Sequence, residues 1–165
     1  MGNASRFIKG LKLVESSNHD WTEMYVDESG HYWLKYMVDR DTGRYFNVML
    51  ISPAPTTEQM IEIALTSDDN DEVEGASHRL LIEEEEEMKD FRPHLVGRLQ
   101  AIDISGLSNT DKKRIRTIIF NTHLLEKENK REVVGKTLSQ IQADSDYFTS
   151  VGEFAERLLT QIGRS

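Results

Sequence analysis

Two acidic segments carry the side chains best suited to recognise a cation. One is the run Glu83-Glu84-Glu85-Glu86-Glu87, and the other is Asp68-Asp69-Asn70-Asp71-Glu72. Like charges this close together destabilise a helix, and a cation-rich partner would relieve their repulsion. A solvated helix end or loop is the alternative interpretation of the glutamate run. We expect these carboxylates to contact a basic partner: Asp68, Asp69, Asp71, Glu72, Glu83, Glu84, Glu85, Glu86 and Glu87.

The charge is unevenly distributed along the chain. Residues 58–90 contain thirteen acidic and two basic residues, whereas residues 111–136 contain eight basic and four acidic residues. The formal net charge of the whole chain is −9. Nonspecific binding to nucleic acid requires an excess of Lys and Arg, as does attraction to an anionic membrane. We therefore expect a basic protein partner, no nucleic acid and no membrane. The oligomeric state stays open, because the basic segment could pair with the glutamate run within one molecule or between two.

Catalytic and metal-binding motifs are missing from the sequence. There is no Gly-x-Ser-x-Gly elbow, and Gly135-Lys136-Thr137 has the end of a P-loop without the upstream glycine. The segment Asp68–Glu72 lacks the ligand spacing and closing glutamate of a calcium loop. The chain has no cysteine and so offers no thiolate zinc site or cysteine nucleophile. We expect no catalytic residue, no metal and no cofactor; a metal-dependent hydrolase is the third-ranked function.

Length and composition bound the fold and the compartment. The 165 residues suffice for one domain with a hydrophobic core, which we expect to span residues 1–165. We expect neither a signal peptide nor a membrane span, because no apolar run approaches the roughly 20 residues that a membrane helix needs. The absence of cysteine fits a reducing compartment. A cytoplasmic location is therefore the expectation.

The first third of the chain predicts an antiparallel β-meander. Aromatic and β-branched residues alternate there, and Gly30 and Gly43 lie where hairpin turns need a positive φ. We expect four strands: 7–15, 21–27, 31–39 and 44–52. Both faces of this sheet would carry aromatic residues and methionines. We therefore expect Trp33, Tyr45 and Met49 to be exposed anchors for the partner.

After Pro55, the sequence predicts helices. Three capping-box patterns mark helix starts: Thr56 with Gln59, Ser108 with Asp111, and Ser150 with Glu153. The segment 132–146 is either a helix weakened by Gly135 or a loop. We expect the α+β class, with an N-terminal antiparallel β-meander (1–52) followed by a helical C-terminal two-thirds (56–165).

A small, acidic, cysteine-free chain carries the aromatic segments Trp21-Thr22-Glu23-Met24-Tyr25 and His31-Tyr32-Trp33, followed by helices around Phe91-Arg92. In these features, mainly over residues 21–102, it resembles the immunity proteins of bacterial polymorphic-toxin and contact-dependent inhibition systems. The resemblance implies a non-catalytic protein that blocks the basic active site of a toxin, often a nuclease, with its carboxylates. It transfers no individual site residue. An adaptor or self-assembling interaction protein is the alternative function.

Overall fold

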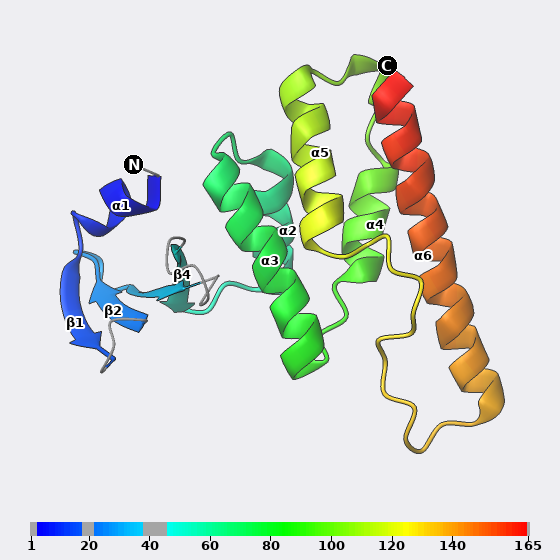
Figure 1. Cartoon of the computed structure of the whole chain (residues 1–165), viewed down its shortest axis with the longest axis horizontal. Helices are drawn as coiled ribbons and strands as arrows, with labels where there is room; N and C mark the ends of the chain where they lie inside the picture. Colours follow the sequence, from blue (N-terminus) through cyan, green and yellow to red (C-terminus); the bar gives the residue numbers. More distant parts are fainter. Residues whose placement is uncertain (1–2, 18–21, 38–45, 165) are drawn as a thin grey trace. The chain divides into compact units, whose positions relative to one another are not determined.

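The chain has an α+β architecture in which a four-stranded antiparallel sheet precedes a series of helices (Figure 1). The computed structural model describes residues 3–17, 22–37 and 46–164. The chain divides into two compact units, residues 1–59 and residues 60–165, and each is described by itself below. The expected single domain over 1–165 stays a prediction.

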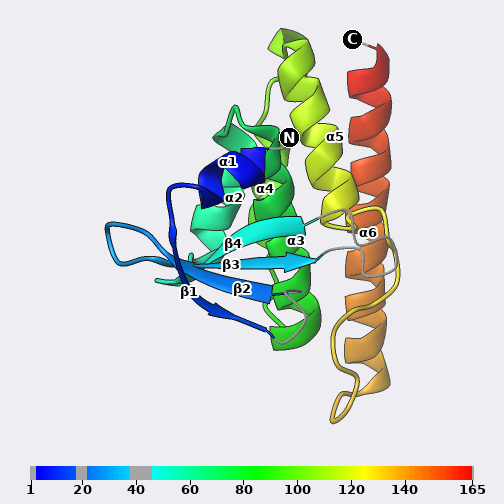
Figure 2. The same cartoon turned by 60° about the vertical axis from the view of Figure 1, so that its left-hand side comes forward.

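The sheet is the meander that the sequence predicts. Its strands follow one another in the order β1-β2-β3-β4, and each neighbouring pair is antiparallel (Figure 2). The bounds are β1 Lys12–Ser16, β2 Thr22–Val26, β3 Tyr32–Met37 and β4 Phe46–Ser52. Leu34 lies opposite Met24 on one side and Met49 on the other. Gly30, at φ +81°, forms the β2–β3 turn as expected. The predicted turn at Gly43 lies outside the described residues.

The start of the chain corrects the predicted opening strand over Phe7–Glu15. Residues Asn3–Ile8 form helix α1, and β1 begins only at Lys12. The backbone N–H groups of Gly10 and Leu11 bond back to the carbonyls of Phe7 and Ile8 and close the helix. The Phe7 ring meets Trp33 edge-on, with 4.7 Å between centroids. This packing against the sheet outweighs the local strand preference.

Helices make up the rest of the chain. Their bounds are α2 Thr57–Thr66, α3 Asn70–Glu87, α4 Arg92–Gln100, a 3₁₀ turn at Ile104–Gly106, α5 Asn109–Asn121 and α6 Leu138–Arg164. Two predicted capping boxes are confirmed. Thr56 and Gln59 exchange hydrogen bonds of 2.9 and 3.2 Å, and Ser108 and Asp111 exchange bonds of 3.2 and 3.1 Å.

The third predicted capping box is wrong. Ser150 lies inside α6, and its hydroxyl donates to the Tyr147 carbonyl at 2.7 Å instead of capping a new helix. The helix begins at Leu138, where Thr137 and Gln140 cap each other with bonds of 2.8 and 3.3 Å. Gly135 sits at φ +77° in the preceding loop. The segment 132–146 is therefore a loop that becomes a helix at Leu138.

The hydrophobic core of the second unit is formed by one face of each helix. Helices α3 and α5 lie side by side, and α6 runs beside α5 (Figures 1 and 2). One face of α6 buries Val151, Leu158 and Ile162 and partly buries Phe154. Burial of each such side chain stabilises the fold by about 1.5–3 kcal/mol. This packing holds the ends of α3, α4 and α6 in fixed relative positions.

Candidate partner-binding surface

Glu84 is buried in an ion pair that joins α3 to the start of α4. Two nitrogens of the Arg92 guanidinium, Nε and Nη2, donate to the two carboxylate oxygens of Glu84 at 2.7 and 2.8 Å. Nη1 of Arg92 also donates to the His123 carbonyl at 3.3 Å. A buried charge has lost its hydration, and a counter-charge with hydrogen bonds must offset that cost. Glu84 is therefore an internal partner of Arg92, which corrects its expected place on an exposed surface.

Glu83 is also turned inward. Its carboxylate accepts a hydrogen bond from Arg79 Nε at 3.0 Å and pairs with Lys89 Nζ at 3.2 Å. Its side chain is buried. The expectation that Glu83 is exposed is therefore wrong for the same reason as for Glu84. Nearby cations neutralise both carboxylates within the chain.

The remaining glutamates of the run point to solvent. Glu85, Glu86 and Glu87, called here the α3 carboxylates, are exposed in the last turn of α3. Glu87 pairs with Lys89 at 2.8 Å, and this last turn contains no basic residue. Negative side chains at a helix C-terminus lie beside backbone carbonyls that also carry partial negative charge. The position is therefore electrostatically unfavourable in the isolated protein.

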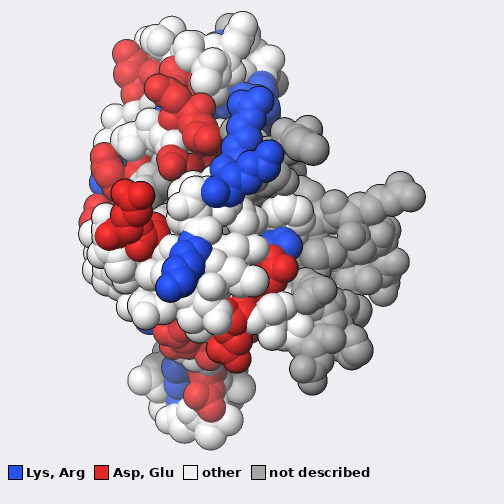
Figure 3. All heavy atoms as spheres, turned by 90° about the vertical axis from the view of Figure 1, so that its left-hand side faces the viewer, with Lys and Arg blue, Asp and Glu red and all other residues white. Residues whose placement is uncertain are grey.

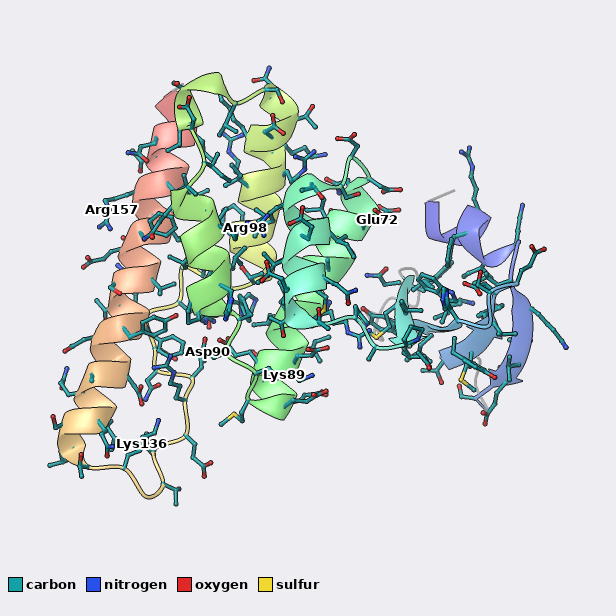
Figure 4. The ribbon with its side chains drawn as sticks, turned by 180° about the vertical axis from the view of Figure 1, so that it is seen from behind. Glu72, Lys89, Asp90, Arg98, Lys136 and Arg157 are labelled. Atoms are coloured by element: carbon teal, nitrogen blue, oxygen red, sulfur yellow. The ribbon has the colours of Figure 1, made fainter. Side chains whose placement is uncertain are left out.

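The second acidic segment lies at the other end of the same helix. Asp69 caps α3 by accepting from the Asp71 N–H at 2.9 Å, and Asp68 pairs with Arg114 at 3.1 Å. Glu72 accepts from the Ser67 hydroxyl at 2.6 Å. Figure 4 shows Glu72 and Lys89 at opposite ends of α3. At 1.5 Å per residue, about 20 Å of helix separates the two acidic segments.

The two acidic segments at the ends of α3 therefore do not gather into one surface. On the face drawn in Figure 3, the acidic side chains occur in separate groups, with lysines and arginines between them. Capping and pairing account for Asp69 and Asp68 at the helix start. Asp68, Asp71 and Glu72 at the helix start are exposed as well, so the α3 carboxylates are one of two exposed acidic groups in the predicted set.

The predicted aromatic anchors belong to the first unit. Trp33 is half-buried, and its indole Nε1 donates to Asp27 at 3.0 Å. This hydrogen bond is the main reason that the pKa of Asp27 is lowered. Met49 is partly buried in β4, opposite Leu34. Tyr45 lies outside the described residues.

A cavity that sequence patterns did not indicate opens beside the α3 carboxylates. Its volume is about 270 Å³, and its lining comes from the end of α3, the α3–α4 turn, the loop before α6 and α6 itself. The lining residues are Glu84, Met88, Asp90, Lys130, Arg131, Glu132 and Phe148. Glu85 is close enough to Lys130 to help raise the pKa of that lysine, after the larger effect of Glu126. The cavity and the α3 carboxylates together form the candidate surface.

Arg131 organises one wall of this cavity. Its guanidinium pairs with Asp90 and with Asp144, the latter at 2.7 Å, and stacks over the Tyr147 ring at 4.5 Å from the centroid. Lys136 also pairs with Asp144 at 2.6 Å, so Lys136 and then Arg131 lower the pKa of that carboxyl group. These ion pairs attach the loop before α6 to the helices. No local sequence spacing could have revealed them, because Asp90 and Arg131 are 41 residues apart.

Comparisons with protein-family models, with curated proteins and with solved structures give no match for this chain. In the described part of the chain, no group of three or more His, Asp or Glu side chains is arranged to hold a metal ion. Of the helices that the structure describes, none combines the length and the apolar character that crossing a membrane requires.

Proposed function

We propose that this protein is an inhibitory binding protein, an immunity protein that neutralises a cognate bacterial toxin by covering its basic active site. The observation that carries the proposal is the exposure of the α3 carboxylates in a helix turn that has no basic residue. The excess of negative charge in the whole chain, −9, supports a cationic partner.

The position of the α3 carboxylates favours binding over a purely structural role. Glu85 and Glu86 make no ion pair within the described residues, and both lie beside the carbonyl end of α3. Their mutual repulsion and their interaction with the helix dipole cost stability in the free protein. A partner's lysines or arginines remove this cost on binding. Before binding, the ion pairs that Glu83 and Glu84 make within the chain keep this turn helical.

The proposed mechanism is electrostatic capture followed by burial of a few contacts. An acidic surface accelerates encounter with a basic partner, and this acceleration falls as salt screens the charges. Affinity then depends on a small number of well-packed contacts in the bound state. The protein acts by occupying the toxin's site and needs no catalytic residue of its own.

The adaptor alternative relies on pairing between acidic and basic regions of neighbouring copies. Arg114, in the basic part of α5, already pairs with Asp68 and Asp111 at 3.1 and 2.9 Å in the same chain. Arg116 donates to the Ile162 carbonyl at 3.2 Å. These contacts leave fewer basic groups on α5 for a second copy.

The decisive experiment uses the reading frame that adjoins the one encoding this chain. Its product is expressed in a bacterial host with and without this chain, and growth is recorded. We expect growth arrest by the neighbouring product and rescue by this chain, together with a stable complex of the two purified proteins. A neighbouring product that is harmless and does not bind this chain would reject the proposal.

A further inference from the structure

Around the cavity, every basic side chain that the structure describes has an acidic partner, but not every carboxylate has a basic one. Arg92 forms an ion pair with Glu84, Arg131 forms ion pairs with Asp90 and Asp144, and Lys130 forms one with Glu126 at 2.6 Å. Among the described residues, Glu132 and Glu85 have no ion pair, although Glu132 lines the cavity and Glu85 lies near Lys130. The cations of the cavity are therefore neutralised, and its free charge is negative.

The rest of the cavity lining is apolar. Phe148 presents a ring that is almost fully buried, and Met88 adds a flexible thioether that is 55% exposed. A group that fits this lining has an aliphatic stem and a cationic head, because the stem can lie along the exposed Met88 while the head reaches Glu132. Lysine and arginine side chains have this structure.

The loop that supplies Glu132 provides a separate sign of a protein partner. It continues into Val133 and Val134, which are 49% and 78% exposed, and Leu138 at the start of α6 is 85% exposed. Apolar side chains this exposed, on the segment that follows a cavity residue, are typical of a surface that another protein covers. A small cationic ligand in the cavity would not contact these apolar side chains.

From these observations we propose that the cavity between Met88, Glu132 and Phe148 receives a lysine or arginine side chain of a basic protein partner. The inference rests on the proposed inhibitory function and adds the chemistry of one contact to it. Glu132 is the carboxylate that binds the cationic head, and Met88 contacts the aliphatic stem, while the buried Phe148 forms part of the cavity wall. Asp90 keeps its pair with Arg131 and shapes the wall.

The test is a titration of the whole ¹⁵N-labelled protein, followed by its amide resonances. The probes are N-acetyl-lysine methylamide and N-acetyl-arginine methylamide, and the neutral control is N-acetyl-norleucine methylamide. We expect saturable shifts at Met88, Arg131, Glu132 and Phe148 with one or both cationic probes. Equal shifts with the norleucine compound, or no saturable shift with either cationic probe, would overturn the inference.

A matched pair of variants assigns the effect to the cavity. Glu132→Gln removes the unpaired carboxylate, whereas Glu128→Gln changes an exposed glutamate in the same loop that does not line the cavity. We expect Glu132→Gln to weaken probe binding roughly 3- to 5-fold, the size of one partly exposed charge pair. We expect Glu128→Gln to leave it unchanged; an equal loss in both variants would contradict a specific contact.

The two proposals fail separately. If the neighbouring product is bound and neutralised but Glu132→Gln leaves its dissociation constant unchanged, the cavity inference fails and the inhibitory function stands. If the cationic probes bind in the cavity but the neighbouring product neither binds nor arrests growth, the immunity function fails and the cavity remains a site for basic side chains.

Discussion

The guanidinium of Arg92 holds both carboxylate oxygens of Glu84 at 2.7 and 2.8 Å, with side chains that are 0% and 6% exposed. This contact connects α3 to the first turn of α4, beneath the rings of Phe91 and Phe148. It fixes the direction in which the last turn of α3 leaves the core. Glu85, Glu86 and Glu87, which follow Glu84 in the helix, are exposed.

Removing one partner of this pair should destabilise the fold strongly. We expect Arg92→Met to lower the free energy of unfolding by about 3–5 kcal/mol, because it leaves Glu84 buried without a counter-charge. The double variant Arg92→Met with Glu84→Gln should recover part of the loss. Urea denaturation measures both. Arg157→Met, which removes an exposed arginine 3.7 Å from Glu153, is the control and should change stability by less than about 1 kcal/mol. Equal losses in the two arginine variants would contradict the special role of the buried pair.

The acid stability of the protein should depend on Asp144. Lys136 and Arg131 lower its pKa below the ordinary value of 3.8, so the unfolded chain binds this proton more readily than the folded one. The ion pairs therefore stabilise the fold above the ordinary pKa and lose their effect as pH falls through the lowered pKa. We expect Asp144→Asn to make stability fall less steeply below about pH 4, as measured by denaturation across pH. Asp146→Asn, which removes a nearby exposed carboxylate that has no ion pair with any described residue, should leave the slope intact.

Two buried hydroxyls should respond to removal in opposite directions. In the described part of the chain, the Ser77 hydroxyl is buried without a hydrogen-bond partner, whereas the Thr122 hydroxyl donates to the Ile118 carbonyl at 2.6 Å. We expect Ser77→Ala to be neutral or to raise the free energy of unfolding by up to about 1 kcal/mol, because it removes an uncompensated polar group. Thr122→Val should cost about 1 kcal/mol. Thermal denaturation of both variants measures these changes. A large loss of stability in Ser77→Ala would indicate that this hydroxyl has a hydrogen-bond partner.

The α3 carboxylates should lower the stability of the free protein, in the absence of any partner. Glu85→Gln with Glu86→Gln removes negative charge from the carbonyl end of α3 and should raise the melting temperature. Asp71→Asn with Glu72→Gln removes the same charge from the opposite end, where it is favourable, and should lower it. Added salt should reduce both effects. A lower melting temperature for the Glu85 and Glu86 variant would mean that these glutamates stabilise the fold, against our proposal.

The close approach of the pre-α6 loop to α6 depends on Gly152. A Cβ atom at this position would lie 2.6 Å from Lys127 Cγ and 3.1 Å from the Leu125 carbonyl oxygen. We expect Gly152→Ala to destabilise the protein by about 1–3 kcal/mol, with partial rescue by Lys127→Ala. Gly97→Ala, on α4, meets nothing within 4 Å and should stabilise by about 0.5–1 kcal/mol. A stabilising Gly152→Ala would show that the loop moves away at little cost.

Local features could be predicted from the sequence, and long-range ones could not. The capping pairs Thr56 with Gln59 and Ser108 with Asp111 involve neighbours three residues apart, so their types suffice. Ser150 and Glu153 show the same pattern and form no cap, since α6 is already helical and buries Phe148 and Val151 on one face.

The long-range partners of the charged side chains could not be predicted from local spacing. Arg92 binds Glu84 only because the turn between α3 and α4 reverses the chain, and Arg131 reaches Asp90 from a loop far along the sequence. A run of five glutamates therefore looks uniform in the sequence although the fold treats its members differently. The cavity, which depends on these folded contacts, has no sequence signature.

The inward turn of Glu83 and Glu84 has a practical meaning for anyone who mutates the glutamate run. Neutralising all five positions together would remove the counter-charges of Arg79 and Arg92 along with the solvent-facing groups. Such a block variant would lose activity by unfolding, and a reader of that assay would mistake collapse for failed recognition. Scanning this stretch one position at a time, with a check of folding for each, separates the two.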